Sequence, residues 1–157
     1  MATVNTKAVR VIGLLTIIAG FLLIAAGATT WFVVRDQLVA ENITIPDDAT
    51  MFAGNTVNGP IDAFVQAEVI NKHALAGSGG LTYAELDRED PARASVMNAS
   101  FLRTSLFSSI IAFGVAAFAM GMGVLMLLIG WALRKLAPAE VVAAPVVERA
   151  EDDRPRA

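Results

Sequence analysis

The chain has 157 residues, no cysteine, one histidine and a formal net charge of −3. The lack of cysteine excludes disulfides, thiolate metal sites and thiol nucleophiles, and the negative charge gives nucleic acid no electrostatic support as a partner. The apolar fraction is 55%, against roughly 45–50% in ordinary soluble domains, and the excess is concentrated in two stretches.

The first stretch runs from Val11 to Val34 without one Asp, Glu, Lys, Arg or His. A helix needs about 20 apolar residues to cross the hydrocarbon core of a bilayer. The sequence therefore predicts a cytoplasmic N-terminus over residues 1–10 and a transmembrane helix over residues 11–34.

A cleaved signal peptide is the alternative interpretation of this first stretch. Lys7 and Arg10 form a basic segment ahead of it, and Ala26-Gly27-Ala28 resembles a small-residue cleavage site. The stretch is longer than the usual apolar core of about 7–15 residues. It also continues through Trp31, a residue typical of membrane interfaces. These features favour an uncleaved anchor.

Glycines recur every seven residues within this stretch, at Gly13, Gly20 and Gly27. On a helix, this spacing aligns them into one nearly straight stripe that lacks side chains. Such a stripe allows another helix to approach closely. We therefore expect these three glycines to be helix-packing residues.

Residues 35–103 carry ten Asp and Glu against five Lys and Arg. The sequence predicts that they form an extracytoplasmic, mostly helical cap. Ile43 to Pro46 reads as an extended segment, and Pro60 is placed to begin a helix that continues to about Ala76. Within that helix, Ile61, Val65 and Val69 are expected on one face, with Phe64 beside them.

His73, the only histidine, extends this face by one turn. Because no second His or Cys exists to build a metal site, a packing or hydrogen-bonding role is favoured. Thr82 and Glu85 match a capping box for a further short helix. Asp90-Pro91 then supplies a helix cap followed by proline at the first helical position.

The second uncharged stretch covers residues 104–133 and is predicted to be the second transmembrane helix. Thirty helical residues extend about 45 Å, whereas the hydrocarbon core is about 30 Å thick. We therefore expect a single helix from about Pro91 to about Leu136 that projects beyond the bilayer on its outer side.

Small residues also repeat at intervals of seven in the second stretch. One set is Gly114 and Gly121, and the other is Ala116, Gly123 and Gly130. We expect the glycines of both sets to be helix-packing residues, either between the two spans or against another subunit, and the sequence leaves both options open. The alternative is that glycine is simply common in transmembrane helices.

Neither span contains an ionisable side chain, the usual mark of proton relays, ion paths and substrate sites within membranes. No catalytic constellation, phosphate-binding loop, metal-ligand set or axial ligand for haem is recognisable. The sequence therefore predicts no catalytic, metal or cofactor-binding residues, and a protein that is not an enzyme.

Basic residues flank the spans at the two chain ends, with Lys7 and Arg10 before the first and Arg134 and Lys135 after the second. The positive-inside rule places both termini in the cytoplasm of a plasma-membrane protein. Arg134 and Lys135 are candidates for contact with anionic lipid headgroups, with a simple topology signal as the alternative. Residues 134–157 are predicted to form a disordered cytoplasmic tail.

Three stretches carry a resemblance to a known family: TTWFVVRDQLVAENITIPDDA (Thr29–Ala49), INKHALAGSGGLTYAEL (Ile70–Leu86) and ASFLRTSLFSSIIAFGVAAFAMG (Ala99–Gly121). They resemble a family of small two-span actinobacterial membrane proteins over about residues 5–135. The family often bears the label of an aromatic ring-opening dioxygenase, which the single histidine does not support, because such an enzyme needs an iron site.

At least one protein that looks like this is an accessory subunit of the actinobacterial cytochrome bc–aa3 respiratory supercomplex. The resemblance implies a non-catalytic accessory subunit of that assembly, with cytochrome oxidase and cytochrome bc subunits as transmembrane partners and no cofactor of its own. The alternative is a membrane-anchored sensory or ligand-binding protein whose extracytoplasmic cap is a receptor.

Overall fold

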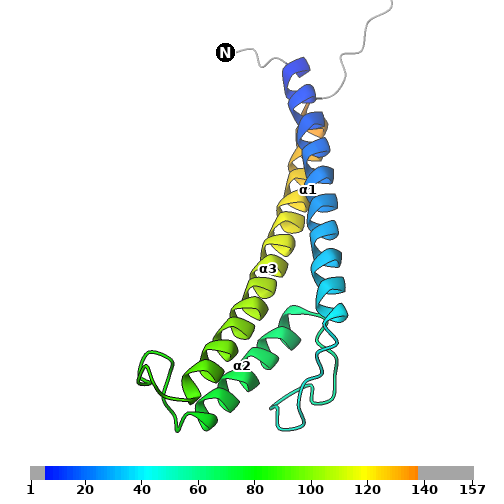
Figure 1. Ribbon diagram of the computed structural model, residues 1–157. Helices are drawn as coiled ribbons and strands as arrows, with labels where there is room; N and C mark the ends of the chain where they lie inside the picture. The colour runs from blue at the N-terminus through cyan, green and yellow to red at the C-terminus, as the bar shows by residue number, and fades with distance from the viewer. Residues whose placement is uncertain (1–5, 138–157) are drawn as a thin grey trace, which may run out of the picture.

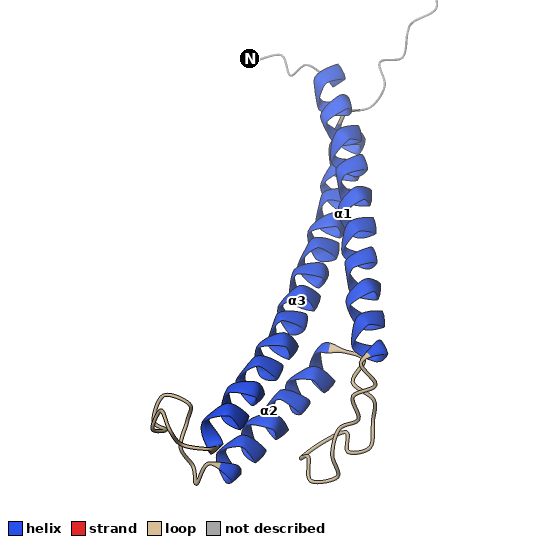
Figure 2. Cartoon of the chain, in the orientation of Figure 1, coloured by secondary structure: helices blue, strands red, loops and turns tan. Residues whose placement is uncertain are grey.

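A computed structural model describes residues 6–137 of the chain (Figure 1). Three helices make up this part: α1 (Thr6–Ala40), α2 (Pro60–Gly77) and α3 (Ala92–Leu136). Two loops connect them (Figure 2), so the expected all-helical fold class is confirmed. Most of the predicted disordered tail, residues 138–157, lies outside the described residues.

Helices α1 and α3 run antiparallel, side by side (Figure 1). Each is long and apolar enough to cross a membrane, yet only 17% of its most apolar stretch is buried within the molecule. The core helix of a soluble protein would hide these side chains, so their exposure indicates a membrane protein. The prediction of one continuous helix from about residue 91 to about residue 136 is confirmed.

Helix α2 lies beyond the end of α1 and packs along the N-terminal part of α3 (Figure 1). It begins with Pro60 in its first turn, as predicted. Of the three residues predicted to share one face, Val65 and Val69 are buried, whereas Ile61 is 60% exposed. Ala63 and Ala67 are fully buried instead, since small side chains allow α2 to approach α3 closely.

The loop between α1 and α2 folds back on itself. Ile43 to Pro46 is extended as expected, and Thr44 forms an isolated antiparallel bridge with Thr56. The Ile45 amide donates to the Asn55 carbonyl at 2.9 Å. These bonds hold Ile45 and Val57, which are almost completely buried, against the junction of the three helices.

The hydrophobic cluster at this junction joins the loop to all three helices. Its helical members come from every helix: Leu38 of α1, Ala63, Val65 and Ala67 of α2, and Leu106 and Phe113 of α3. Trp31 packs on this cluster, and its ring meets that of Phe113 edge-to-face at a centroid distance of 4.7 Å.

The short helix predicted after Thr82 is only a single turn. The expected cap is present in part, because the Glu85 carboxylate accepts from the Thr82 amide at 2.8 Å and from the Thr82 hydroxyl at 2.7 Å. Arg93 of α3 donates to the carbonyls of Tyr83 and Leu86. A continuing helix would need these carbonyls, so the turn ends there.

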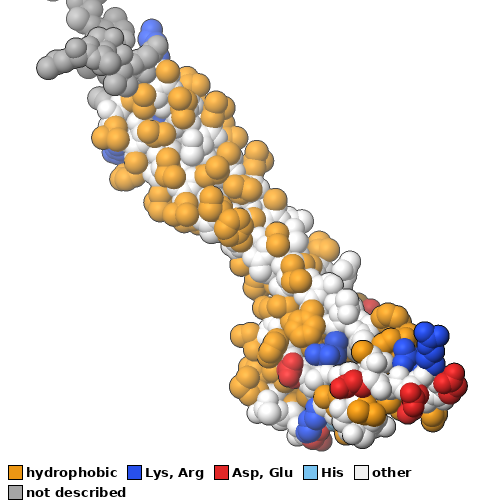
Figure 3. Space-filling model, turned by 90° about the vertical axis from the view of Figure 1, so that its left-hand side faces the viewer, with side chains coloured by type: hydrophobic (Ala, Val, Ile, Leu, Met, Phe, Trp, Pro, Cys, Tyr) orange, Lys and Arg blue, Asp and Glu red, His pale blue; other side chains and the backbone are white. Residues whose placement is uncertain are grey.

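Charge and hydrophobicity separate along the length of the molecule (Figure 3). Apolar side chains cover the part built from α1 and α3, and acidic and basic side chains gather at the opposite end, around α2. We call the latter the α2 end. The sequence predicted this division, because residues 35–103 hold every acidic residue between Thr6 and Ala137.

Candidate helix-packing site

Glycines bring the backbones of α1 and α3 into direct contact. A Cβ atom added at Gly20 would lie 2.7 Å from the carbonyl oxygen of Gly123, and one added at Gly123 would lie 2.6 Å from that of Gly20. Real Cβ atoms essentially never approach another atom within 3.0 Å. Neither position therefore accepts a side chain without a backbone shift.

The same contact repeats one heptad away in each direction. Gly130 stands opposite Gly13, where a Cβ added to Gly130 would lie 2.6 Å from the Gly13 carbonyl oxygen. Ala116 stands opposite Gly27, whose added Cβ would lie 2.7 Å from the Ala116 carbonyl oxygen. We call these six residues the internal seam: Gly13, Gly20, Gly27, Ala116, Gly123 and Gly130.

The internal seam follows from one repeat shared by both helices. A spacing of seven residues keeps one face of a helix turned toward its partner when the pair coils gently. Because the helices are antiparallel, each step of seven along α1 matches a step of seven back along α3. The seam thus shows which of the expected small residues pack between the two helices of this chain.

Gly114 and Gly121 lie elsewhere. No atom of the described chain is within 4 Å of a Cβ built on either. At 100° per residue, Gly121 is about 160° around α3 from Gly123, so it faces away from α1. Large exposed side chains flank both glycines. We call this the open face of α3: Ile111, Gly114, Phe118, Gly121 and Leu125.

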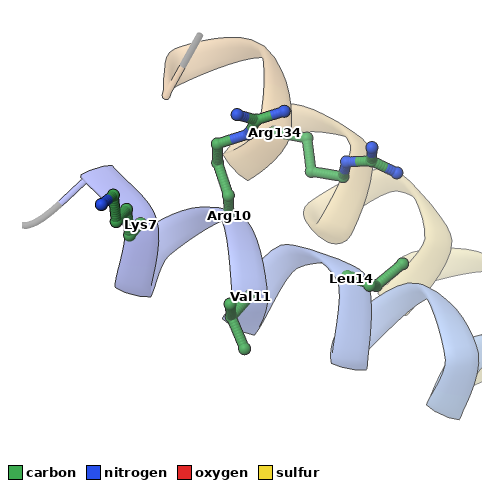
Figure 4. A pocket seen from close by; sticks show the side chains of 5 residues that line it. All are labelled: Lys7, Arg10, Val11, Leu14 and Arg134. Atoms are coloured by element: carbon green, nitrogen blue, oxygen red, sulfur yellow. The ribbon is translucent and has the colours of Figure 1, made fainter. Parts of the chain in front are cut away.

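Four basic residues meet where α1 begins and α3 ends. Lys7 and Arg10 belong to α1, and Arg134 and Lys135 belong to the last turn of α3. Together they line the walls of two neighbouring grooves, one of which is shown in Figure 4. We call these four residues the basic end.

An exposed polar cluster fastens the first loop to α2. The Asp48 carboxylate accepts from Lys72 Nζ at 2.8 Å and lies 2.9 Å from His73 Nε2. The hydrogen bond from Lys72, followed by that from His73, lowers the pKa of Asp48 from 3.8 to about 2. His73 thus has the hydrogen-bonding role expected of it.

The α2 end contains a small cavity between α2 and α3. It measures about 60 Å³ and is lined in part by Asn71, Tyr83 and Arg103. Ligand pockets usually measure about 300–1,000 Å³, so this cavity has room for water rather than an organic ligand. No group of three or more His, Cys, Asp or Glu side chains that could hold a metal ion occurs within residues 6–137.

Comparisons with protein-family models, curated proteins and solved structures found no match. The arrangement of residues therefore carries the functional argument. Sequence reasoning assigned lipid contact only to Arg134 and Lys135 and did not join Lys7 and Arg10 to them. The available signal was that one basic pair precedes the first span and the other follows the second, because two antiparallel spans bring these pairs to the same end.

Proposed function

We propose that this chain is a non-catalytic accessory subunit that stabilises a larger membrane complex by helix packing. The resemblance carried by the segments 29–49, 70–86 and 99–121 makes the actinobacterial cytochrome bc–aa3 supercomplex the candidate assembly. Cytochrome oxidase and cytochrome bc subunits are then the proposed transmembrane partners.

Two tryptophans support a particular position in the bilayer. Gly13 stands opposite Gly130, so Trp131 is level with Ile12 on α1. From residue 12 to Trp31, α1 rises about 28 Å, close to the roughly 30 Å thickness of a hydrocarbon core. Tryptophan favours both membrane interfaces. The two tryptophans therefore mark the two edges of the proposed membrane-spanning part.

The distribution of charge supports one orientation. The basic end lies beyond Trp131, whereas all acidic residues of the described chain lie beyond Trp31, toward the α2 end. By the positive-inside rule, the basic end and both termini are cytoplasmic, and α2 with its loops forms an extracytoplasmic cap. The first turns of α3 then project outside the bilayer beside α2.

The observation that carries the proposal is the open face of α3. The glycines of the internal seam pack against the other helix of this chain, whereas no part of residues 6–137 packs against Gly114 and Gly121 on the far side of α3. Between them, Phe118 is 70% exposed. In lipid, helices associate through close van der Waals contact at small residues. The open face is suited to a helix of another subunit.

Replacing Gly121 with leucine tests the proposal. A Cβ atom added at Gly121 meets no other part of the described chain within 4 Å, so the pairing of α1 and α3 should persist while a partner helix is pushed away. We expect tagged Gly121→Leu protein to recover much less partner from mild detergent than the wild-type chain recovers. Ala26→Leu, at an exposed position of α1, is the matched control and should recover partners normally. Equal recovery with both variants would refute a partner at this face.

The receptor alternative receives less support from the geometry. The cavity between α2 and α3 is too small for an organic ligand. A shallow groove of about 370 Å³ also lies beside Tyr83, but Arg93 is stacked on that ring at 4.0 Å and is bonded to two carbonyls. The guanidinium group of Arg93 is therefore already bound within the protein.

A further inference from the structure

The basic end takes no part in the proposed helix contact at the open face. The packing of α1 on α3 places its arginines. A Cβ built on Gly13 would lie 3.0 Å from Cγ of Arg134. The aliphatic stem of Arg134 therefore rests in the gap that this glycine leaves on α1. Arg10 is one turn from Gly13 on the same helix, and its side chain extends toward α3 (Figure 4). The internal seam thus brings the two arginines together.

These cations have no acidic partner in the described chain. Residues 6–34 and 104–137 contain no Asp or Glu, and the ion pairs within residues 6–137 involve Arg35, Lys72 and His73 instead. The first turn of α1 also lacks the acidic residue that would balance the positive end of its helix dipole. Four cations that lack a counter-charge within residues 6–137 favour a bound anion.

The two grooves at this end are amphipathic. One measures about 410 Å³ and continues from Lys7 and the two arginines to the apolar side chains of Val11 and Leu14. The other measures about 260 Å³, and its apolar wall is formed by Ile17 and Trp131. Arg10 and Arg134 line both grooves. A ligand that fills either groove needs an anionic head and an apolar tail.

We propose that the basic end is a binding site for one anionic phospholipid, with its phosphate between Arg10 and Arg134 and an acyl chain along Val11 and Leu14. Guanidinium groups bind phosphate oxygens in a bidentate manner. Free phosphate would leave the apolar walls uncovered, whereas a phospholipid satisfies both parts of the groove. The proposal rests on insertion of the chain in a membrane and does not depend on any partner subunit.

The two tryptophans of the chain provide a test with an internal control. Trp131 lines the second groove, whereas Trp31 lies at the opposite end of the spanning part. In the full chain, Trp31→Phe leaves Trp131 as the only reporter, and Trp131→Phe leaves Trp31. Each variant is placed in vesicles of phosphatidylglycerol and phosphatidylcholine, with bromine quenchers on the acyl chains of one lipid at a time.

Brominated phosphatidylglycerol should quench Trp131 more strongly than brominated phosphatidylcholine, with about fivefold higher apparent affinity. Trp31 should show no such preference. The double variant Arg10→Gln and Arg134→Gln should abolish the preference at Trp131, and Arg88→Gln, which removes a charge at the α2 end, should preserve it.

Equal quenching of Trp131 by the two lipids would overturn the proposal without the need for any arginine variant. A preference that persists in the double variant would also overturn it. Neither result would affect the recovery of partner subunits through the open face, so this site and the proposed assembly role fail separately.

Discussion

Gly121 and Gly123 lie two residues apart on opposite faces of α3, so two variants of the same chemistry can test the internal seam. Gly123→Ala places a methyl group 2.6 Å from the Gly20 carbonyl oxygen and from Ile24 Cγ1. Ordinary contacts begin at 3.4 Å, so the helices must separate by about 0.8 Å at this point. Overpacking of this kind costs about 1–3 kcal/mol.

Gly121→Ala adds the same methyl group two residues earlier on α3, where nothing lies within 4 Å. The higher helix propensity of alanine should leave this variant unchanged or stabilise it by up to about 1 kcal/mol. The assay is detergent-induced unfolding of the purified chain, followed through the fluorescence of Trp31 in a Trp131→Phe background. If both variants shift the free energy of unfolding equally, the backbone contact at Gly20 does not exist.

Three further predictions concern other parts of the chain. Phe113→Ala should lower the free energy of unfolding by about 3 kcal/mol, because its ring is buried against Trp31; Phe118→Ala, at an exposed position, should leave the same chemical denaturation curve unchanged. The lowered pKa of Asp48 means that its contribution to stability is present above about pH 4 and is lost as pH falls toward 2. The hydrogen-exchange protection factors of residues 41–59, which are corrected for the intrinsic exchange rate at each pH, should therefore fall over that range, and constant protection factors would contradict the bonds to α2. Hydrogen bonds from Thr82 hold the pKa of Glu85 below its ordinary value, so Thr82→Ala should raise that pKa in a carboxyl NMR titration, and an unmoved titration curve would contradict the turn.

The sequence was most informative about the length and type of the helices. Uncharged runs and the signals at Pro60 and Pro91 predicted the three helices closely, because these are local properties of the chain. The face of α2 was predicted less well. Ile61 fits the helical period as well as Ala63 does, and only the close approach of α3 determines that the smaller side chain is buried.

The spacing of the glycines alone could not predict which of them contact α1 and which lie on the open face. Both glycine sets on α3 repeat every seven residues, so each fits an internal or an external partner. The register of α1 against α3 places Gly123 in the internal seam and leaves Gly121 on the open face. The basic end depends on the same register, because it joins residues from opposite ends of the described chain.

The central claim is that this chain belongs to a larger membrane complex. Its most direct test is quantitative mass spectrometry of the proteins that co-purify with the tagged full chain from native membranes in mild detergent. The account predicts cytochrome oxidase and cytochrome bc subunits in constant proportion to the chain, and a less stable supercomplex in a deletion strain. Recovery of the chain as a lone monomer, together with an unaltered supercomplex after deletion, would contradict it.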